Sequence, residues 1–434
     1  MFLANLQRAR QSKLARNAGW MLAGQGSKLA IQALYFTLIA RALGVRNYGA
    51  FVGVVGLVGI LSPFGTLGSG YLLIKNVARD PGQFRENWSA ALSTTAISSS
   101  LLFGLVLLLS RFLLPATIPL RIVMFVAGAD LFGTGITGIC GQAFMAFERM
   151  RWTASFGVLQ STSRTVAAVA LAGLYPRPSA LQWGSFYFAS TIVVALVALA
   201  TVVIKLGMPK FVWARGWPEI REGLYFSINQ SAETVYNDID KTMLARLATL
   251  EATGIYGAAY RLIDVSFAPV WSLIAAAYPN LFRVGAEGIA ATLTYAKPLF
   301  LRALAYAAFL ALVVVACAGI LPLVLGSEYQ RCVEALRWLA VLPLFRVIHV
   351  FLSDSLSGAG YQGLRSAIHV GVAVFNALIN LWLIPAYTWR GAAWSSICSD
   401  ALLALCIAAA VFLLMRRSPI LPAQTKALGM GAEA

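Results

Sequence analysis

Apolar segments alternate with short polar links along the whole chain. A run of about 20 apolar residues is long enough to cross the hydrocarbon core of a bilayer as a helix. We therefore predict an all-α polytopic membrane protein with about twelve transmembrane helices and no separate soluble domain. The expected spans lie near residues 17–40, 48–74, 88–110, 119–146, 152–175, 181–206, 222–247, 254–282, 298–325, 332–357, 364–388 and 391–415.

A basic link that contains tryptophan and proline divides the twelve spans into two sets of six. The expected organisation is a cytoplasmic amphipathic head at 1–16, an N-terminal half at 17–206, a cytoplasmic linker at 207–221, a C-terminal half at 222–415 and a cytoplasmic tail at 416–434.

Weak internal repetition supports two related halves. A Tyr-Gly dipeptide at 48–49 recurs 208 positions later at 256–257, and Trp183 and Trp394 are 211 positions apart. Transporter folds are often built from internal repeats that surround a central binding site. We therefore expect two six-helix repeats, related by an axis along the membrane normal, around a central cavity.

Composition agrees with a membrane protein, because 59% of the residues are hydrophobic and only 12% are charged. Soluble domains carry about 25% charged residues. The net charge of +17 comes mainly from Lys and Arg in the links, nineteen on the side of the N-terminus and seven on the other side. This asymmetry predicts that both termini are cytoplasmic, and it is not the basic stripe of a nucleic-acid-binding fold.

The sequence offers little material for catalysis or metal binding. Five scattered cysteines show no metal-ligand spacing, and the two histidines, His349 and His369, lie in apolar segments. A histidine-based metal site or a catalytic triad is therefore excluded. With no large soluble loop to hold an active site, we do not expect an enzyme, and we expect no bound cofactor.

The stretch 229–264, in the middle of the chain, carries more charge than any other part of the expected membrane-spanning region. Read as a helix, it places Asn229, Glu233, Tyr236 and Asp240 on one face, with Lys241 beside them. A charge at mid-bilayer costs about 2.5 to 3.5 kcal/mol on insertion scales. Several charges in one span need a wet or paired environment, so this segment is predicted to line the cavity.

Several motifs resemble one family. They are Asn17 and Trp20 near the start, the segment IARALGVRNYGAF, the second Tyr-Gly motif after Asp240, and the segment IPAYTWRGAA, with Thr388 where glycine is common. Together they resemble the polysaccharide biosynthesis flippases, the Wzx-type lipid-linked oligosaccharide flippases of the multidrug/oligosaccharidyl-lipid/polysaccharide exporter superfamily. The resemblance implies a bacterial inner-membrane protein that moves undecaprenyl-pyrophosphate-linked sugar units, such as O-antigen, lipopolysaccharide or exopolysaccharide repeats, to the periplasmic leaflet.

A pyrophosphate headgroup requires fixed cations in a wet cavity, and Arg and Lys supply charge-assisted hydrogen bonds to phosphate oxygens. Lys28 and Arg164 have no acidic partner in their own span, although Asp130, Asp354 and Asp400 could pair with them from other spans. The expected substrate-binding residues are Lys28, Gln25, Arg164, Lys241, Arg261 and Arg346.

A second chemistry is suggested by the acidic residues Glu233, Asp238, Asp240 and Asp264, which could couple transport to H+ or Na+. The alternative interpretation is neutralisation, because Asp238 with Lys241 and Arg261 with Asp264 have the i,i+3 spacing of helical ion pairs. The membrane potential could also drive an anion outward, at about 2.3 kcal/mol per charge per 100 mV.

Three functions remain open at this stage. The first is a flippase that works by alternating access on a polyprenyl-pyrophosphate-linked glycan. The second is a cation-coupled multidrug or small-molecule antiporter of the same superfamily. The third is a polytopic scaffold for polysaccharide enzymes, and a polymerase and glycosyltransferases are possible partners in any case. A basic cavity would favour the flippase, and an acidic, aromatic one the antiporter.

Overall fold

The computed structural model describes residues 2–210 and 217–417, which are helical throughout and contain no strand. The N-terminal half comprises α1 (Phe2–Leu61), η1 (Ser62–Gly65), α2 (Ser69–Arg79), η2 (Pro81–Gln83), α3 (Phe84–Leu113), α4 (Leu120–Ala127), η3 (Gly128–Thr134), α5 (Gly135–Ala146), α6 (Met150–Leu174) and α7 (Ala180–Leu206). The C-terminal half comprises α8 (Trp217–Leu247), α9 (Leu250–Gly285), α10 (Ile289–Cys317), η4 (Ala318–Ile320), α11 (Leu321–Leu325), η5 (Ser327–Tyr329), α12 (Cys332–Leu339), α13 (Leu342–Gly358), α14 (Gln362–Tyr387) and α15 (Trp389–Arg417).

The first helix makes two passes, because α1 breaks at Gly44, whose φ is 68°. The π-helical turn η3 joins α4 to α5 in one pass, and α12 continues into α13 in another. In the described part of the chain this gives twelve passes, six in each half, as the hydrophobic pattern predicts. Helix α1 begins at Phe2, so the predicted head, 1–16, continues into the first pass without a break in the helix. The expected linker and tail fall partly outside the described residues.

Only eight stretches of the described chain are both long enough and apolar enough to be recognised as membrane spans, and the first of them, Gly19–Arg79, contains both passes of α1. The three helices left out are α6, α8 and α9. These helices carry Arg164, Asp238 and Arg261, so their lower hydropathy reflects polar residues in the middle of a span. Helices α6, α8 and α9 are therefore the first places to look for a functional site.

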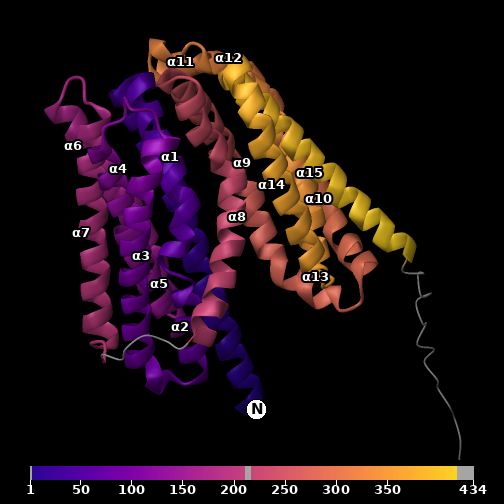
Figure 1. Cartoon of the computed structure of the whole chain (residues 1–434). Coiled ribbons are helices and arrows are strands. Elements are labelled where there is room, and N and C mark those ends of the chain that lie inside the picture. Colours follow the sequence, from indigo (N-terminus) through magenta and orange to yellow (C-terminus); the bar gives the residue numbers. More distant parts are fainter. Residues whose placement is uncertain (1, 211–216, 418–434) are drawn as a thin grey trace, which may run out of the picture.

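The halves form two bundles that meet at one end and diverge towards the other (Figure 1). We call the end that carries α11 and α12 the closed end, and the end that carries the N-terminus the open end. One hydrophobic core runs through both halves and includes Tyr48, Tyr256 and Tyr329, whereas the other clusters each lie within a single half. The shared core explains why the halves stay together at the closed end.

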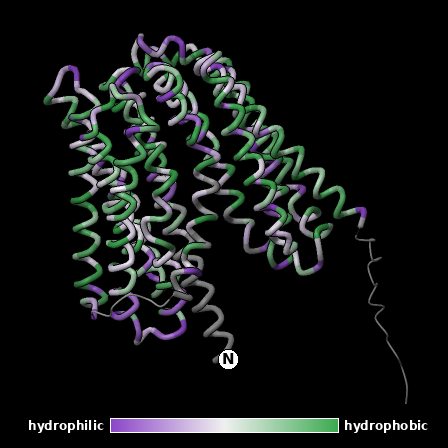
Figure 2. The backbone as a smooth tube through the Cα atoms, viewed as in Figure 1, coloured by the Kyte–Doolittle hydropathy of each residue, from purple (hydrophilic) through white to green (hydrophobic). Residues whose placement is uncertain are grey.

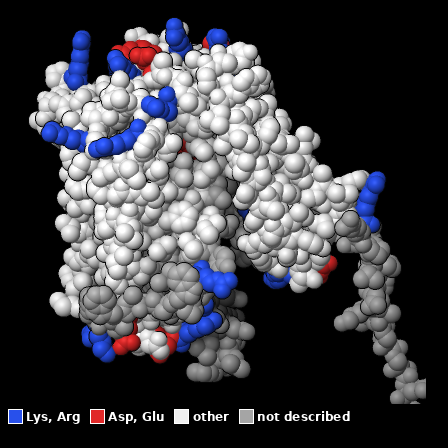
Figure 3. Space-filling model, viewed as in Figure 1, with Lys and Arg blue, Asp and Glu red and all other residues white. Residues whose placement is uncertain are grey.

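The surface agrees with a membrane environment. Figure 2 shows hydrophobic residues along most of the length of the helices, and in Figure 3 the charged residues of the visible face gather near the two ends. The belt between them is almost free of charge on this face, and large apolar side chains such as Leu101, Leu312 and Trp382 are exposed. A belt of this kind is typical of a protein that crosses a bilayer.

The repeated Tyr-Gly motifs lie at the contact between the halves. A Cβ added at Gly49 would lie 1.8 Å from the carbonyl oxygen of Leu250, and one at Gly257 would lie 2.9 Å from Cγ1 of Val52. A Cβ added at Gly254 would lie 2.0 Å from the carbonyl oxygen of Val45. Small residues let membrane helices approach closely. The motifs therefore hold the second pass of α1 against α9.

Candidate functional site

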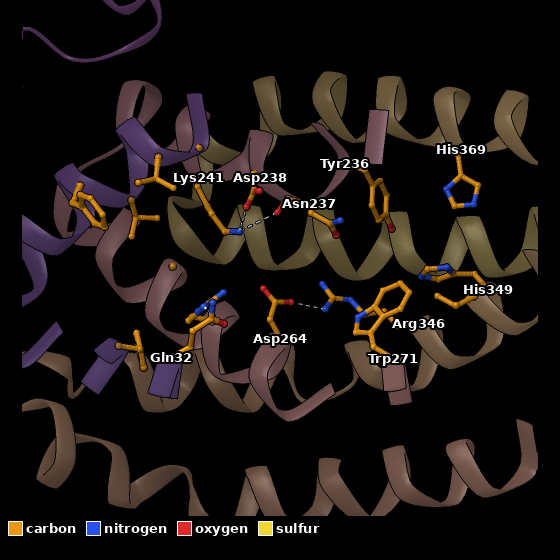
Figure 4. Close-up of a pocket in the computed structure, with 18 of the residues that line it drawn as sticks. Gln32, Tyr236, Asn237, Asp238, Lys241, Asp264, Trp271, Arg346, His349 and His369 are labelled. Atoms are coloured by element: carbon orange, nitrogen blue, oxygen red, sulfur yellow. Dashed lines mark hydrogen bonds and ion pairs between the residues drawn. The ribbon is translucent and has the colours of Figure 1, made fainter. Parts of the chain in front are cut away.

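A central cavity of about 1300 Å³ lies between the two halves. Figure 3 shows the hollow between the bundles, and Figure 4 shows part of its lining. Side chains from α1, α6, α7, α8, α9, α13 and α14 surround it. Its described lining holds five basic side chains, Arg164, Lys241, Arg261, Arg346 and Arg365, against two acidic ones, Asp238 and Asp264.

On the N-terminal side, Arg164 of α6 is held in a polar network. Its Nη2 lies 3.3 Å from Oδ1 of Asp130, and its guanidinium lies over the ring of Tyr187, 4.2 Å from the ring centre. The Tyr187 hydroxyl donates to the same carboxylate oxygen at 2.7 Å. Asp130 lies in the π-helical turn η3, where the wider turn alters the register of the helix. Of the three carboxylates that could pair with Arg164, the partner is therefore Asp130, which neutralises Arg164 at the cavity wall.

On the C-terminal side, two basic residues flank the ring of Tyr260. Lys241 Nζ forms a close ion pair with Asp238, and it lies 4.3 Å from the centre of the Tyr260 ring. Arg346 Nη1 lies 2.7 Å from Oδ1 of Asp264. The i,i+3 pair Asp238–Lys241 therefore forms, whereas Asp264 pairs with Arg346 of α13 and not with Arg261.

Carboxylates that lie just behind the lining hold Arg346 and Arg365. Arg346 Nε lies 3.5 Å from Oδ2 of Asp400, and the hydroxyl of Tyr236 donates a short hydrogen bond to Oδ1 of the same carboxylate. Nearer the open end, Arg365 Nη1 lies 3.1 Å from Oδ1 of Asp354. Ion pairs desolvated in this way are costly to break, because the partner left behind is an uncompensated charge. Most of the cavity's basic residues are thus fixed in place by acidic neighbours.

Arg261 of α9 differs from the other cations of the lining. Among the described residues it forms no ion pair, and its one hydrogen bond is from Nη2 to Oε1 of Gln32, at 3.4 Å. Gln32 lies on the first pass of α1, so this contact joins the two halves. Arg261 is therefore the lining cation that retains most of its capacity to bind an anion.

Four of the six expected substrate-binding residues line the cavity: Arg164, Lys241, Arg261 and Arg346. Gln25 is exposed, and neither it nor Lys28 belongs to the lining. Within the described structure Lys28 has no ion pair, and its Cδ would lie 3.8 Å from a Cβ added at Gly157. Lys28 therefore packs along α6 beside the cavity.

Two of the expected ion-coupling residues, Asp238 and Asp264, line the cavity. Asp240 lies behind it and is buried. It accepts a short hydrogen bond from the hydroxyl of Tyr256, one of 3.2 Å from Ser396 and one of 2.7 Å from the backbone N–H of Lys241. The side chain of Glu233 lies outside the described part of the structure.

The sequence reading did not identify Arg365 or the aromatic residues Trp271 and Tyr278 as lining residues. A signal was present, because Arg261, Asp264, Trp271 and Tyr278 follow each other at steps of three and seven residues and so share one face of α9. His349 and His369 also face the cavity, with their ring centres 6.4 Å apart. The described residues contain no cluster of His, Cys, Asp and Glu that could hold a metal ion.

Solved structures of transporters share this fold. An inward-facing multidrug resistance MATE family transporter of the MOP superfamily aligns with a TM-score of 0.74 at 13% identity, over 90% of this chain and 96% of that chain. The lipid II flippase MurJ, in an inward closed conformation, aligns with a TM-score of 0.70 at 10% identity, over 90% of this chain and 87% of that one.

A further solved structure shares the fold. An outward-facing multidrug resistance MATE family transporter aligns with a TM-score of only 0.61 at 12% identity, over 94% of this chain and 97% of that one. At these identities the likeness shows the fold alone.

Sequence comparison identifies the family. No curated protein sequence matches the chain. The model of the family described as "Polysaccharide biosynthesis protein" matches residues 14–284, which is more than half of the chain. The chain therefore belongs to the polysaccharide biosynthesis protein family, and it has the fold of MOP superfamily transporters.

Proposed function

We propose that this protein flips a polyprenyl-pyrophosphate-linked oligosaccharide across the bacterial inner membrane. The two halves rock about their contact at the closed end, so that the central cavity opens to the two sides of the membrane in turn. The expected substrate is an undecaprenyl-pyrophosphate-linked repeat unit of a surface polysaccharide. In this proposal the protein performs no covalent chemistry.

The observation that carries the proposal is Arg261, a cavity cation whose described partner is a neutral amide. A guanidinium binds phosphate oxygens with two parallel hydrogen bonds. Arg164, Lys241 and Arg346 add positive potential to the same cavity while their own carboxylates hold them in position. The family match and the fold shared with a lipid II flippase support a lipid-linked glycan as the cargo.

The direction of transport follows from the proposed orientation. The excess of Lys and Arg on the side of the N-terminus favours cytoplasmic termini. The cavity then opens towards the cytoplasm, where lipid-linked repeat units are assembled. Outward movement of a pyrophosphate gains about 2.3 kcal/mol per charge per 100 mV of potential. We propose the membrane potential as the driving force. Coupling to H+ or Na+ would have to use Asp238 and Asp264, the two carboxylates of the described lining, in competition with their partners Lys241 and Arg346.

The second candidate function is a cation-coupled multidrug antiporter, and the fold shared with MATE transporters favours it. An antiporter for cationic drugs needs unpaired carboxylates in its cavity. Both acidic side chains of the described lining, Asp238 and Asp264, are paired with cations instead. The flippase therefore accounts better for the charges.

The test is complementation in a bacterial strain that lacks its own flippase, at matched membrane expression. We expect Arg261→Ala to lower surface polysaccharide about tenfold or more, because a charged hydrogen bond is worth about 1.5–3 kcal/mol, while the lipid-linked precursor accumulates. The control is Arg302→Ala, since Arg302 is exposed on α10 and lies outside the cavity.

The other outcomes separate the alternatives. Drug resistance that depends on Asp238 and Asp264 but not on Arg261 would favour the antiporter. A chain that supports polysaccharide export whichever single cavity charge is removed would favour a scaffold that holds a polymerase and glycosyltransferases together.

A further inference from the structure

One face of α9 changes in character along the cavity. Arg261 and Asp264 lie towards the closed end, and Trp271 and Tyr278 follow towards the open end. At a rise of 1.5 Å per residue, Trp271 lies about 15 Å from Arg261 along the helix axis, and Tyr278 about 26 Å. The cavity thus has a charged region and, beyond it, an aromatic one.

The two aromatic side chains leave much of their surface open inside the cavity. Trp271 is 46% exposed and Tyr278 is 37% exposed, and each is braced by one aromatic neighbour. The ring of Phe267 meets Trp271 edge-on at 5.9 Å, and the ring of Phe282 meets Tyr278 edge-on at 5.0 Å. Both side chains are therefore positioned by packing while part of each ring stays available to a ligand.

Polar side chains of the cavity wall face the same region. His349 is only 6% exposed, yet neither of its ring nitrogens has a hydrogen-bond partner among the described residues. Its Nε2 lies 3.7 Å from Oδ1 of Asp400, beyond hydrogen-bond distance. In Figure 4 His349 lies beyond Arg346 and Trp271, and His369 lies near it. One turn further along α13, Ser353 also lines the cavity, and its hydroxyl lies 3.2 Å from Nε2 of His369, with which it forms a hydrogen bond. Asp400 is thus the carboxylate at ion-pair distance from His349, and a buried imidazole that makes no hydrogen bond to the described residues favours a ligand with hydroxyl groups.

We infer that Trp271, Tyr278 and His349 form a subsite for the sugar part of the cargo, separate from the pyrophosphate site at Arg261. This inference rests on the proposed function and names which part of the cargo each region binds. A sugar ring presents an apolar C–H face, which stacks on an aromatic ring, and a rim of hydroxyl groups, which bonds to imidazole and serine. The separation along α9 is one that a short oligosaccharide can span.

The polyprenyl tail is the other apolar part of such a lipid, and it suits this region less well. A hydrocarbon chain would leave His349 without a hydrogen bond and would place methylene groups against Arg346 and Arg365. A sugar can both stack on the aromatic rings and form hydrogen bonds with the polar side chains. The aromatic region therefore belongs to the glycan.

The experiment measures binding to the purified full-length protein in detergent by native mass spectrometry, with two probes. One is undecaprenyl pyrophosphate, which carries no sugar. The other is the undecaprenyl-pyrophosphate-linked oligosaccharide extracted from cells that lack the protein. We expect Trp271→Ala to weaken binding of the glycolipid about tenfold and to leave the sugar-free lipid within about twofold, because truncated tryptophans dominate binding losses at packed contacts.

Three further variants complete the test. Trp271→Phe, which keeps an aromatic ring, should recover most of the affinity for the glycolipid. Trp382→Ala should bind both probes as the unaltered protein does, because Trp382 is 73% exposed on α14 and lies outside the cavity. Arg261→Ala should weaken both probes alike, since both carry the pyrophosphate.

The outcomes separate the subsite from the proposed function. If Trp271→Ala weakens both probes equally, or neither, the glycan subsite is wrong while the flippase proposal stands. If the unaltered protein binds neither probe, the proposed function fails, and the subsite fails with it.

Discussion

The carboxylate of Glu328 accepts a hydrogen bond of 3.1 Å from the backbone N–H of Val45. Val45 begins the second pass of α1, directly after the break at Gly44, and Glu328 lies in η5 of the other half. Gly44 has a φ of 68°, which strains any other residue, and a Cβ there would also lie 2.6 Å from this carboxylate and push it aside. Beside it, the buried hydroxyl of Tyr329 donates to the carbonyl oxygen of Ala40 at 2.9 Å. These contacts join the two halves at the closed end.

We expect Glu328→Ala to weaken this closure. The Val45 N–H loses a charged acceptor worth about 1.5–3 kcal/mol, so its hydrogen exchange should accelerate about 10- to 100-fold. The control is Glu334→Ala, because Glu334 pairs with Arg390 within the C-terminal half at 2.9 Å. Unchanged exchange at Val45 in the Glu328 variant would show that the carboxylate does not hold the closed end.

Gly49 should not tolerate even alanine. Its added Cβ would overlap the carbonyl oxygen of Leu250 at 1.8 Å, and neither helix can yield without separating α1 from α9. We expect Gly49→Ala to lower the melting temperature in detergent by roughly 5 °C or more. Gly104→Ala is the matched control, since a Cβ there meets nothing within 4 Å. Equal melting temperatures for the two variants would contradict the close packing of the halves.

Arg164 is expected to act in stability as well as in transport. Arg164→Gln leaves Asp130 without its cation in a largely buried site, which should cost about 3 kcal/mol of unfolding free energy. Adding Asp130→Asn removes the uncompensated charge, so the double variant should regain most of the stability. Its transport should stay low if the cation also attracts the substrate. Full transport in the double variant would assign Arg164 a structural role alone.

Asp240 is expected to be structural. Tyr256, Ser396 and the backbone N–H of Lys241 all donate to it, and an asparagine has only one oxygen to accept these bonds. Asp240→Asn should therefore lower stability by about 1–3 kcal/mol and leave the sodium and pH dependence of transport unchanged. Asp238→Asn, at a carboxylate that lines the cavity, provides the comparison. Loss of ion dependence in the Asp240 variant alone would assign the coupling site to Asp240.

The order of spans was determined by the sequence alone. Runs of apolar residues long enough to cross a bilayer, separated by short basic links, allow little besides a polytopic helical protein, because backbone polar groups in lipid must be satisfied within the helix. The recurrence of Tyr-Gly at 48–49 and 256–257 indicated two related halves. The polar stripe that contains Tyr236 and Asp240, with Lys241 beside it, predicted a cavity-lining helix, since mid-span charges need a polar environment. Tyr236 and Lys241 do line the cavity, whereas Asp240 is buried behind it.

Tertiary structure decided which charges are free. Asp130 lies 34 positions from Arg164, and Asp264 lies 82 positions from Arg346, so no helical spacing could reveal either pair. The i,i+3 spacing left open whether Asp264 neutralises Arg261. Arg261 forms no ion pair among the described residues, because Arg346 of α13 takes that carboxylate. Lys28, which looked free and central, packs beside α6 instead. A single sequence shows which side chains share a helix face, whereas the rotation and packing of the helices determine which faces meet.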